Sequence, residues 1–124
     1  MRELLAVMKA LADPSRLRIV AALRGRELCL CQIVELVGLA TSTVSRHMSI
    51  LEHARLVDAR KDGRWAYYRL PEGDDARSFA PLFEWLSEAL QGDELIMRDA
   101  QVLEEVLARD PEEVARNQRT RTRD

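Results

Sequence analysis

Hydrophobic residues recur every three or four positions over most of the chain, which is typical of helices that bury one face. The first such run occupies residues 4–11. Asp13 and Pro14 follow it and predict a second helix, because Asp caps first-turn N–H groups and proline fits the first helical turn. This helix extends to about Arg24 and ends at Gly25.

Two further helices are separated by a tight turn. The first is predicted from about Cys29 to Val37, and after Gly38 the second begins with Thr41 as its cap and reaches about Arg55. Two helices joined by a short Gly-containing turn form a helix-turn-helix, whose second helix enters the major groove of DNA. The inward stripe of this second helix comprises Val44, His47, Met48 and Leu51.

Four polar residues of the second helix lie off its apolar stripe and are predicted to contact DNA. Arg46 is the strongest candidate for a base contact, because its guanidinium can bridge O6 and N7 of guanine. Hydroxyl side chains suit contacts to bases or phosphates. We interpret His47, on the inner stripe, as a packed structural residue. The four outward residues are Thr43, Ser45, Arg46 and Ser49.

A hairpin is predicted next. Residues 56–60 and 64–70 are rich in β-branched and aromatic side chains, and Asp62-Gly63 between them is a turn signal. Lys61 and Arg64 flank the tip and suit DNA phosphates or the minor groove. A plain solvated hairpin is the alternative. After a helix-turn-helix, the hairpin predicts a wing, so the fold class is mainly α with a small β-hairpin, a winged helix-turn-helix.

The rest of the chain is acidic and helical. Apolar faces recur over residues 79–90 and 95–107. With the first helix, they predict a homodimer whose two-fold axis matches a palindromic operator, with intramolecular packing as the alternative. We place the DNA-binding and dimerisation domain at residues 1–110. Residues 111–124 hold four arginines and little apolar content, so we expect a flexible basic tail.

Charge refines this division. The net charge of −2 combines a balance of +3 over residues 41–70 with −10 over residues 71–113. The middle of the chain therefore resembles a nucleic-acid binder, here double-stranded DNA, while the acidic residues of the second half read as a solvated face. No apolar run approaches the ~20 residues of a membrane span, and no signal-peptide pattern is present. We expect no membrane partner and a cytoplasmic protein with reduced thiols.

The two cysteines of the chain stand one residue apart, at Cys29 and Cys31, just before the helix-turn-helix. Close pairing beside a DNA-reading element suggests a switch in which a thiophilic ligand disturbs DNA binding. Two small buried core residues are the alternative. The sequence shows no nucleophile–base pair, phosphate loop or catalytic metal motif, so we expect neither an enzyme nor a permanent cofactor.

Three runs together resemble the ArsR/SmtB family, and within it most closely the arsenical-resistance operon repressors. They are residues 27–31, 43–48 and 60–70, and the likeness covers about residues 5–90 in order. The resemblance implies a dimeric repressor that leaves its operator when As(III) or Sb(III) binds. By position, Cys29 and Cys31 would be the metalloid thiolates. Thr43, Ser45 and Arg46 fall on recognition-helix positions, and Lys61 and Arg64 fall on the wing.

The chain departs from the family pattern at several positions. Val34 stands where many relatives have a third cysteine, Gln32 replaces a frequent Asp, and Thr41-Ser42 replaces a frequent Gln-Pro. As(III) favours three ligands, so the third must be hydroxide, a small thiol or a thiol of the other subunit. A methylated trivalent arsenical would need only two sulfurs. Relatives that sense cadmium or lead add N-terminal cysteines, and those that bind zinc use late histidines; this chain has neither.

The Cys-x-Cys spacing suggests a mechanism. Side chains two residues apart on a helix differ by roughly 200° in direction, so chelation is expected to distort the first turn of the Cys-bearing helix. A helix N-terminus also favours thiolate. Two other functions stay open. One is a redox-sensing repressor that uses the same cysteines, and the other is a winged-helix protein-interaction module that never binds DNA.

Overall fold

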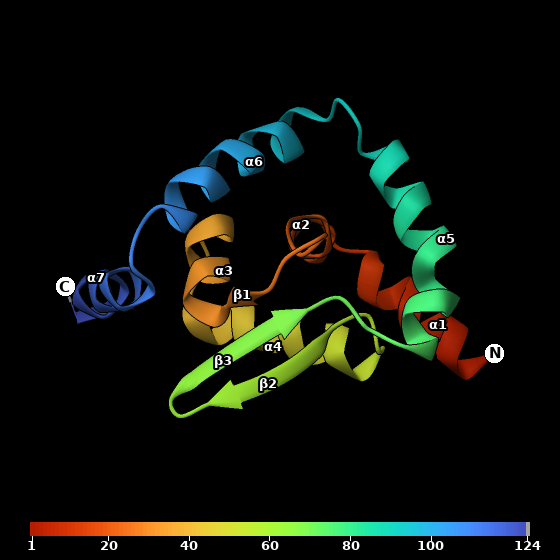
Figure 1. Cartoon of the computed structure of the whole chain (residues 1–124), viewed down its shortest axis with the longest axis horizontal. Helices are drawn as coiled ribbons and strands as arrows, with labels where there is room; N and C mark the ends of the chain where they lie inside the picture. Colours follow the sequence, from red (N-terminus) through yellow and green to blue (C-terminus); the bar gives the residue numbers. More distant parts are fainter. Residues whose placement is uncertain (124) are drawn as a thin grey trace.

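The computed structural model describes the backbone of residues 1–123 and the side chains of residues 1–121. Helices α5, α6 and α7 follow one another in an arc around α2 and α3, and the sheet lies at the open side of this arc (Figure 1). Among the described residues, none of the helices combines the length and the hydrophobicity that a membrane span requires. The elements are α1 (Arg2–Leu11), α2 (Pro14–Ala22), β1 (Leu28–Cys29), α3 (Leu30–Val37), α4 (Thr41–His53), β2 (Asp58–Asp62), β3 (Trp65–Arg69), α5 (Asp74–Ala89), α6 (Glu94–Leu107) and α7 (Pro111–Arg123).

The predicted helix-turn-helix is formed by α3 and α4. Gly38 ends α3 with φ +71°, a left-handed conformation that suits glycine, and so permits the tight turn. Asp13 caps α2 as predicted, because its Oδ2 accepts the Arg16 N–H at 3.0 Å. Buried apolar side chains from α2, α3, α4 and the segment after α4 form the core, including Ile19, Leu23, Ile33, Val44, Met48, Leu51 and Leu56.

The expected ends of two helices were misplaced by a residue or two. Ala40, not Thr41, is the N-cap of α4, and no side chain caps this end of the helix. The helix ends at His53 and is followed by Arg55 at φ +65°. At α3, Cys29 is the N-cap with extended backbone, so the helix itself begins at Leu30.

The wing is part of a three-stranded antiparallel sheet of order β1-β3-β2. Asp62 pairs with Trp65, so Gly63 and Arg64 are the two turn residues. The very short strand β1, which the sequence did not predict, pairs Cys29 with Tyr67. The cysteine-bearing segment is therefore hydrogen-bonded directly to the wing.

Helix α1 buries Val7 and Ala10, but most of its predicted apolar stripe is exposed to solvent. Leu4, Leu5 and Met8 are about half exposed. On α5, Trp85 is 62% exposed. Because large apolar side chains that stay exposed in one chain often mark an interface, this surface suits the predicted homodimer.

The C-terminal residues form helix α7 where the sequence predicted a flexible tail. Val114 is 1% exposed and packs with Cys29 and Cys31. Asp110 accepts the Glu112 N–H at 3.1 Å and so stabilises the start of the helix. Val114 docks this segment on the apolar surface that α3 and the wing supply, which a local pattern in a polar tail does not show. Residue 124 lies outside the described residues.

Candidate cysteine site and nucleic-acid interface

The cysteine pair straddles the start of α3. Cys29 lies before the first turn with φ −81° and ψ 160°, and Cys31 lies within that turn. Because Cys29 is not helical, the roughly 200° separation expected within a helix does not apply. Both side chains belong to one buried cluster, and each thiol is the largest influence on the pKa of the other. The argument from helix geometry therefore does not apply to this pair, and distortion of α3 on chelation stays a prediction.

The two thiols differ in acidity. A hydrogen bond from the Cys31 thiol, helped by the backbone N–H groups of Gln32 and Cys31, outweighs burial and lowers the pKa of Cys29 to about 7. The same thiol–thiol hydrogen bond, together with burial, raises the pKa of Cys31. The pair therefore holds one proton loosely and one firmly. The neighbouring thiol is the largest cause, and the backbone N–H groups at the start of α3, on which the sequence argument relied, lower the pKa further.

Both sulfurs lie under a cover made by α7 and the wing. Cys29 is 1% exposed and Cys31 is 8% exposed. Val114 packs on them from α7, and Trp65 and Tyr67 pack on them from β3. The Cys31 sulfur also lies 3.7 Å from the Pro111 carbonyl oxygen, so its one proton has two acceptors to choose between, this carbonyl and the Cys29 sulfur. Any ligand on Cys31 must disturb this contact with α7.

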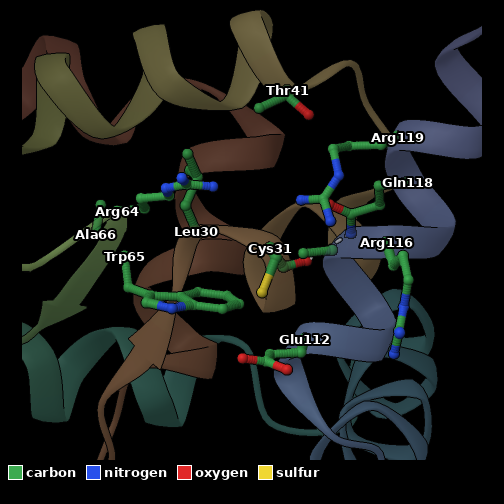
Figure 2. Close-up of a pocket in the computed structure, with 11 residues that line it drawn as sticks. Leu30, Cys31, Thr41, Arg64, Trp65, Ala66, Glu112, Arg116, Gln118 and Arg119 are labelled. Carbon is green, nitrogen blue, oxygen red and sulfur yellow. Dashed lines mark hydrogen bonds between the residues drawn. The ribbon is translucent and has the colours of Figure 1, made fainter.

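Cys31 also borders a pocket of about 680 Å³ between α3, α4, the wing and α7 (Figure 2). The Trp65 ring and the Cys31 sulfur lie at the same end of it in this view. The pocket gives a small molecule a route to the sulfur. Its lining comprises Leu30, Cys31, Thr41, Arg64, Trp65, Ala66, Glu112, Ala115, Arg116, Gln118 and Arg119.

Polar contacts converge on Glu35 of α3 and hold α7 in place. Its carboxylate accepts hydrogen bonds from Arg121 at 2.6 Å and Gln118 at 3.1 Å, and Arg109 lies 3.7 Å away. Gln118 also donates to the Cys31 carbonyl at 2.7 Å. The backbone of the cysteine segment is therefore tied directly to α7.

The described residues of one chain contain no group of three or more His, Cys, Asp or Glu that could hold a metal ion. A ligand at the pair therefore has two protein sulfurs available from this chain. This fits a centre that takes its third ligand from elsewhere, and it does not fit a four-ligand zinc site within the chain.

The predicted DNA-reading residues lie on α4 and the wing. Ser45, Arg46 and Ser49 are exposed, and Thr43 is partly buried. Lys61 lies near the end of β2 and Arg64 lies in the turn, both exposed. His47 is fixed by a contact inside the domain, because its Nδ1 accepts a hydrogen bond from the Arg16 guanidinium at 3.0 Å. Its position agrees with the structural interpretation.

Sequence reasoning missed the part that α7 plays. The signal was present, because Asp110-Pro111 repeats the cap signal that was used at Asp13-Pro14. The lone apolar residue Val114 in an otherwise polar segment could have indicated where this helix docks. Sequence reasoning also treated the late acidic residues as solvated, yet Asp99 is buried and bonds Arg18 at 2.8 and 3.0 Å.

Comparisons with known proteins agree on one family. Residues 13–59 match the family described as "Bacterial regulatory protein, arsR family". The chain is 39% identical over 80 residues to the transcriptional repressor SmtB homolog of a Synechocystis strain, covering 64% of this chain and 61% of that protein. It is 41% identical over 69 residues to the arsenical resistance operon repressor of Staphylococcus xylosus, covering 56% and 66%. The chain thus spans less than two thirds of the length of either relative.

A solved structure supports the fold. The homodimeric winged helix-turn-helix DNA-binding domain Mb0332 from Mycobacterium bovis, described as a possible ArsR-family transcriptional regulator, matches with a TM-score of 0.60. It is 32% identical, and the match covers 75% of this chain and 86% of that one. The winged helix-turn-helix prediction is confirmed. These relatives are DNA-binding regulators and not enzymes, as the sequence predicted.

Proposed function

Since the chain belongs to the ArsR family of transcriptional regulators, we propose that it represses transcription as a homodimer on a palindromic operator. We propose further that As(III) or Sb(III) binds Cys29 and Cys31 and releases the operator. The observation that carries this proposal is the pair of adjacent buried thiols, one of them with a pKa of about 7, beside a pocket.

The chemistry of the pair suits a trivalent arsenical. Arsenous acid exchanges two hydroxyl groups for the two cysteine sulfurs, so two As–O bonds break and two As–S bonds form. Two water molecules leave, carrying the two thiol protons, and solvent supplies the proton of a thiol that is already ionised. Arsenic keeps its oxidation state, and its third ligand stays hydroxide or becomes an external thiol. The thiolate is the attacking form, so the lowered pKa of Cys29 lets it react first near neutral pH.

The described part of one chain offers no third metal-binding side chain beside the two cysteines, and this affects which arsenical fits the site. A methylated trivalent arsenical needs only two sulfurs and would carry its methyl group as the third substituent. The apolar side of the pocket, formed by Leu30, Trp65 and Ala66, could hold that methyl group. Titration with arsenite, antimonite and methylarsenite therefore decides among the three ligands.

Release is proposed to pass through α7 and the wing. Ligation removes the Cys31 thiol proton, and it leaves this sulfur facing the Pro111 carbonyl oxygen without a hydrogen to bridge them. The bulk of the ligand must also fit beside Val114, Trp65 and Tyr67. The bound state therefore favours a shifted α7 and wing, and typical allosteric couplings are about 1–3 kcal/mol.

On the DNA side, we propose that α4 enters the major groove and that Arg46 reads a guanine. Thr43, Ser45 and Ser49 contact bases or phosphates around it, and Lys61 and Arg64 bring the wing to the backbone. The open apolar residues of α1 and α5 form the homodimer contact, which sets the two recognition helices for a symmetric operator.

Two variants, each expected to change either effector response or DNA binding but not both, test the proposal. The DNA is the region upstream of the protein's own gene. Cys29→Ser should bind this DNA like the wild type and stay bound when arsenite is added. Arg46→Ala should bind DNA more weakly, by about 1–3 kcal/mol, and still bind arsenite. Normal release of Cys29→Ser by arsenite would refute the assigned site. Unchanged DNA binding by Arg46→Ala would remove it as a base contact.

The redox alternative is supported by the same thiol–thiol contact. Peroxide would oxidise the two thiols to a disulfide and be reduced to two water molecules. Peroxide-driven release in the absence of arsenical, together with no response to arsenite, would favour this function. Binding of the wild type to its upstream DNA would also exclude a module that only binds proteins.

A further inference from the structure

The basic end of the pocket beside α7 is not used by the chemistry of the cysteines. In Figure 2 the guanidinium groups of Arg64 and Arg119 lie on opposite sides of the pocket and point toward one another below Thr41. Arg64 comes from the wing turn and Arg119 from α7, which are far apart in the sequence. Arg116, one turn earlier on α7, also lines the pocket.

These arginines have no hydrogen-bond or ion-pair partner among the side chains that the structure describes, residues 1–121. Among the residues whose side chains the structure describes, no hydrogen bond or ion pair reaches the guanidinium of Arg64, Arg116 or Arg119. By contrast, Arg121 on the same helix is paired with Glu35. The carboxylate in the lining, Glu112, lies at the opposite end of the pocket, beside Cys31 and Trp65 (Figure 2). The basic end therefore has unneutralised charge.

The position of this end matters as much as its charge. Thr41 is the first residue of α4, the recognition helix, and no side chain caps that helix start. Arg64 belongs to the wing. Where a recognition helix meets a wing, the DNA backbone passes close by, and guanidinium groups suit phosphate because they donate two parallel hydrogen bonds.

We propose that Arg64 and Arg119 together bind a backbone phosphodiester of DNA, which makes α7 a third DNA-contacting element beside α4 and the wing. The ligand is a phosphate group, and its source is the DNA duplex. This inference requires that the chain binds DNA, and it does not depend on which effector the cysteines take. It gives α7 two roles, because the same helix covers Cys29 and Cys31.

The test measures binding to duplex DNA at a series of KCl concentrations, without arsenical. The duplexes are the region upstream of the protein's own gene and a random sequence. Arg119→Gln should weaken both by a similar factor, roughly 3- to 10-fold, and lower the slope of log affinity against log salt by about one per chain. For a homodimer, the slope should fall by about two.

Two comparison variants separate charge from structure. Arg119→Lys should keep the wild-type slope, because it keeps the charge. Arg98→Gln removes one exposed charge from α6 and should leave the slope unchanged. If Arg119→Gln and Arg98→Gln give the same affinity and slope, the site is not a DNA contact. If Arg119→Lys behaves like Arg119→Gln, the effect is structural, and the proposal also fails.

A further arm distinguishes DNA from a small anion. Thermal unfolding is compared in inorganic phosphate and in chloride at equal ionic strength. We expect no difference between the wild type and Arg119→Gln, because one free phosphate gains little without the neighbouring contacts of the duplex. Phosphate stabilisation that Arg119→Gln abolishes, with an unchanged DNA slope, would assign the site to a free anion and overturn the proposal.

Discussion

Helices α6 and α7 both pack against α3, but they are held by different kinds of contact. Helix α6 contributes the buried residues Leu103 and Val106, and its Asp99 forms a two-point ion pair with Arg18. Helix α7 contributes one fully buried residue, Val114, and a set of polar contacts around the partly exposed Glu35. Exposed ion pairs contribute little to stability, and segments with little buried apolar surface open locally at low free-energy cost. Helix α7 is therefore the helix that can open without unfolding the domain.

The difference places the cysteine pair under the weaker of the two helices. A permanent cover would exclude any effector, and no cover would leave the thiols open to every oxidant. A helix that opens at small cost allows both protection and access.

Breaking the α6 contact is expected to have the largest effect. Asp99→Ala leaves the mostly buried Arg18 without its carboxylate and should lower the free energy of unfolding by about 3 kcal/mol. Chemical denaturation measures this change. Glu104→Ala, an exposed change on the same helix, is the control and should alter stability by less than about 0.5 kcal/mol. Equal stability of the two variants would show that the ion pair does not anchor α6.

Loosening the α7 contact should act on access to the thiols. Val114→Ala removes two buried methyl groups and should lower the free energy that favours the closed position of α7 by about 1.5 kcal/mol. The open population then rises, so alkylation of the cysteines should accelerate roughly 10-fold. Mass spectrometry after timed iodoacetamide treatment measures the rate. Val106→Ala is a matched control, since it removes the same groups from α6. If both variants accelerate labelling equally, α7 does not open independently.

Removing the polar contacts of α7 should have a smaller effect. Glu35→Gln weakens the contacts with Arg121 and Arg109 and should cost about 0.5 kcal/mol, seen as two- to threefold faster alkylation. Salt should shrink the difference. Burial acts to raise the pKa of Glu35, but hydrogen bonds from Gln118 and Arg121 outweigh it, and the pKa is lowered.

The lowered pKa of Glu35 fixes the sign of a pH effect. The stabilisation is complete above the ordinary carboxyl pKa and is lost as the pH falls through the lower pKa of the folded state. Hydrogen exchange of α7 amides, corrected for intrinsic rates, should therefore show more opening in acid for the wild type. In Glu35→Gln this pH dependence should be reduced. Identical pH profiles would exclude Glu35 as the cause.

The last prediction concerns the acidity of the thiols and not the opening of a helix. Cys31→Ala removes the hydrogen bond that contributes most to the low pKa of Cys29, so the pKa should rise above about 7 toward the ordinary thiol range. Thiolate absorbance against pH measures it. The wild type should form one thiolate near pH 7 and keep the second thiol protonated to much higher pH. An unchanged midpoint in the variant would mean that backbone N–H groups alone lower the pKa.

Local signals were enough to predict the helix-turn-helix and the wing. The cap at Asp13, the left-handed turn at Gly38 and the turn after Asp62 each act over a few residues, and apolar periodicity marked the buried stripe of α4. These features are encoded in short stretches of chain, so the sequence alone predicts them. The family and the pairing of the two cysteines could also be recognised from short motifs.

Sequence alone identified the residues that we propose to carry the chemistry, namely two thiols beside a helix-turn-helix and a basic wing. The tertiary structure decided how these residues meet. Strand β1 joins Cys29 to the wing, α7 folds back over Cys31, and Arg119 comes to face Arg64. Each of these contacts joins segments distant in the chain. Such contacts depend on packing across the whole domain, which no local pattern of residues specifies.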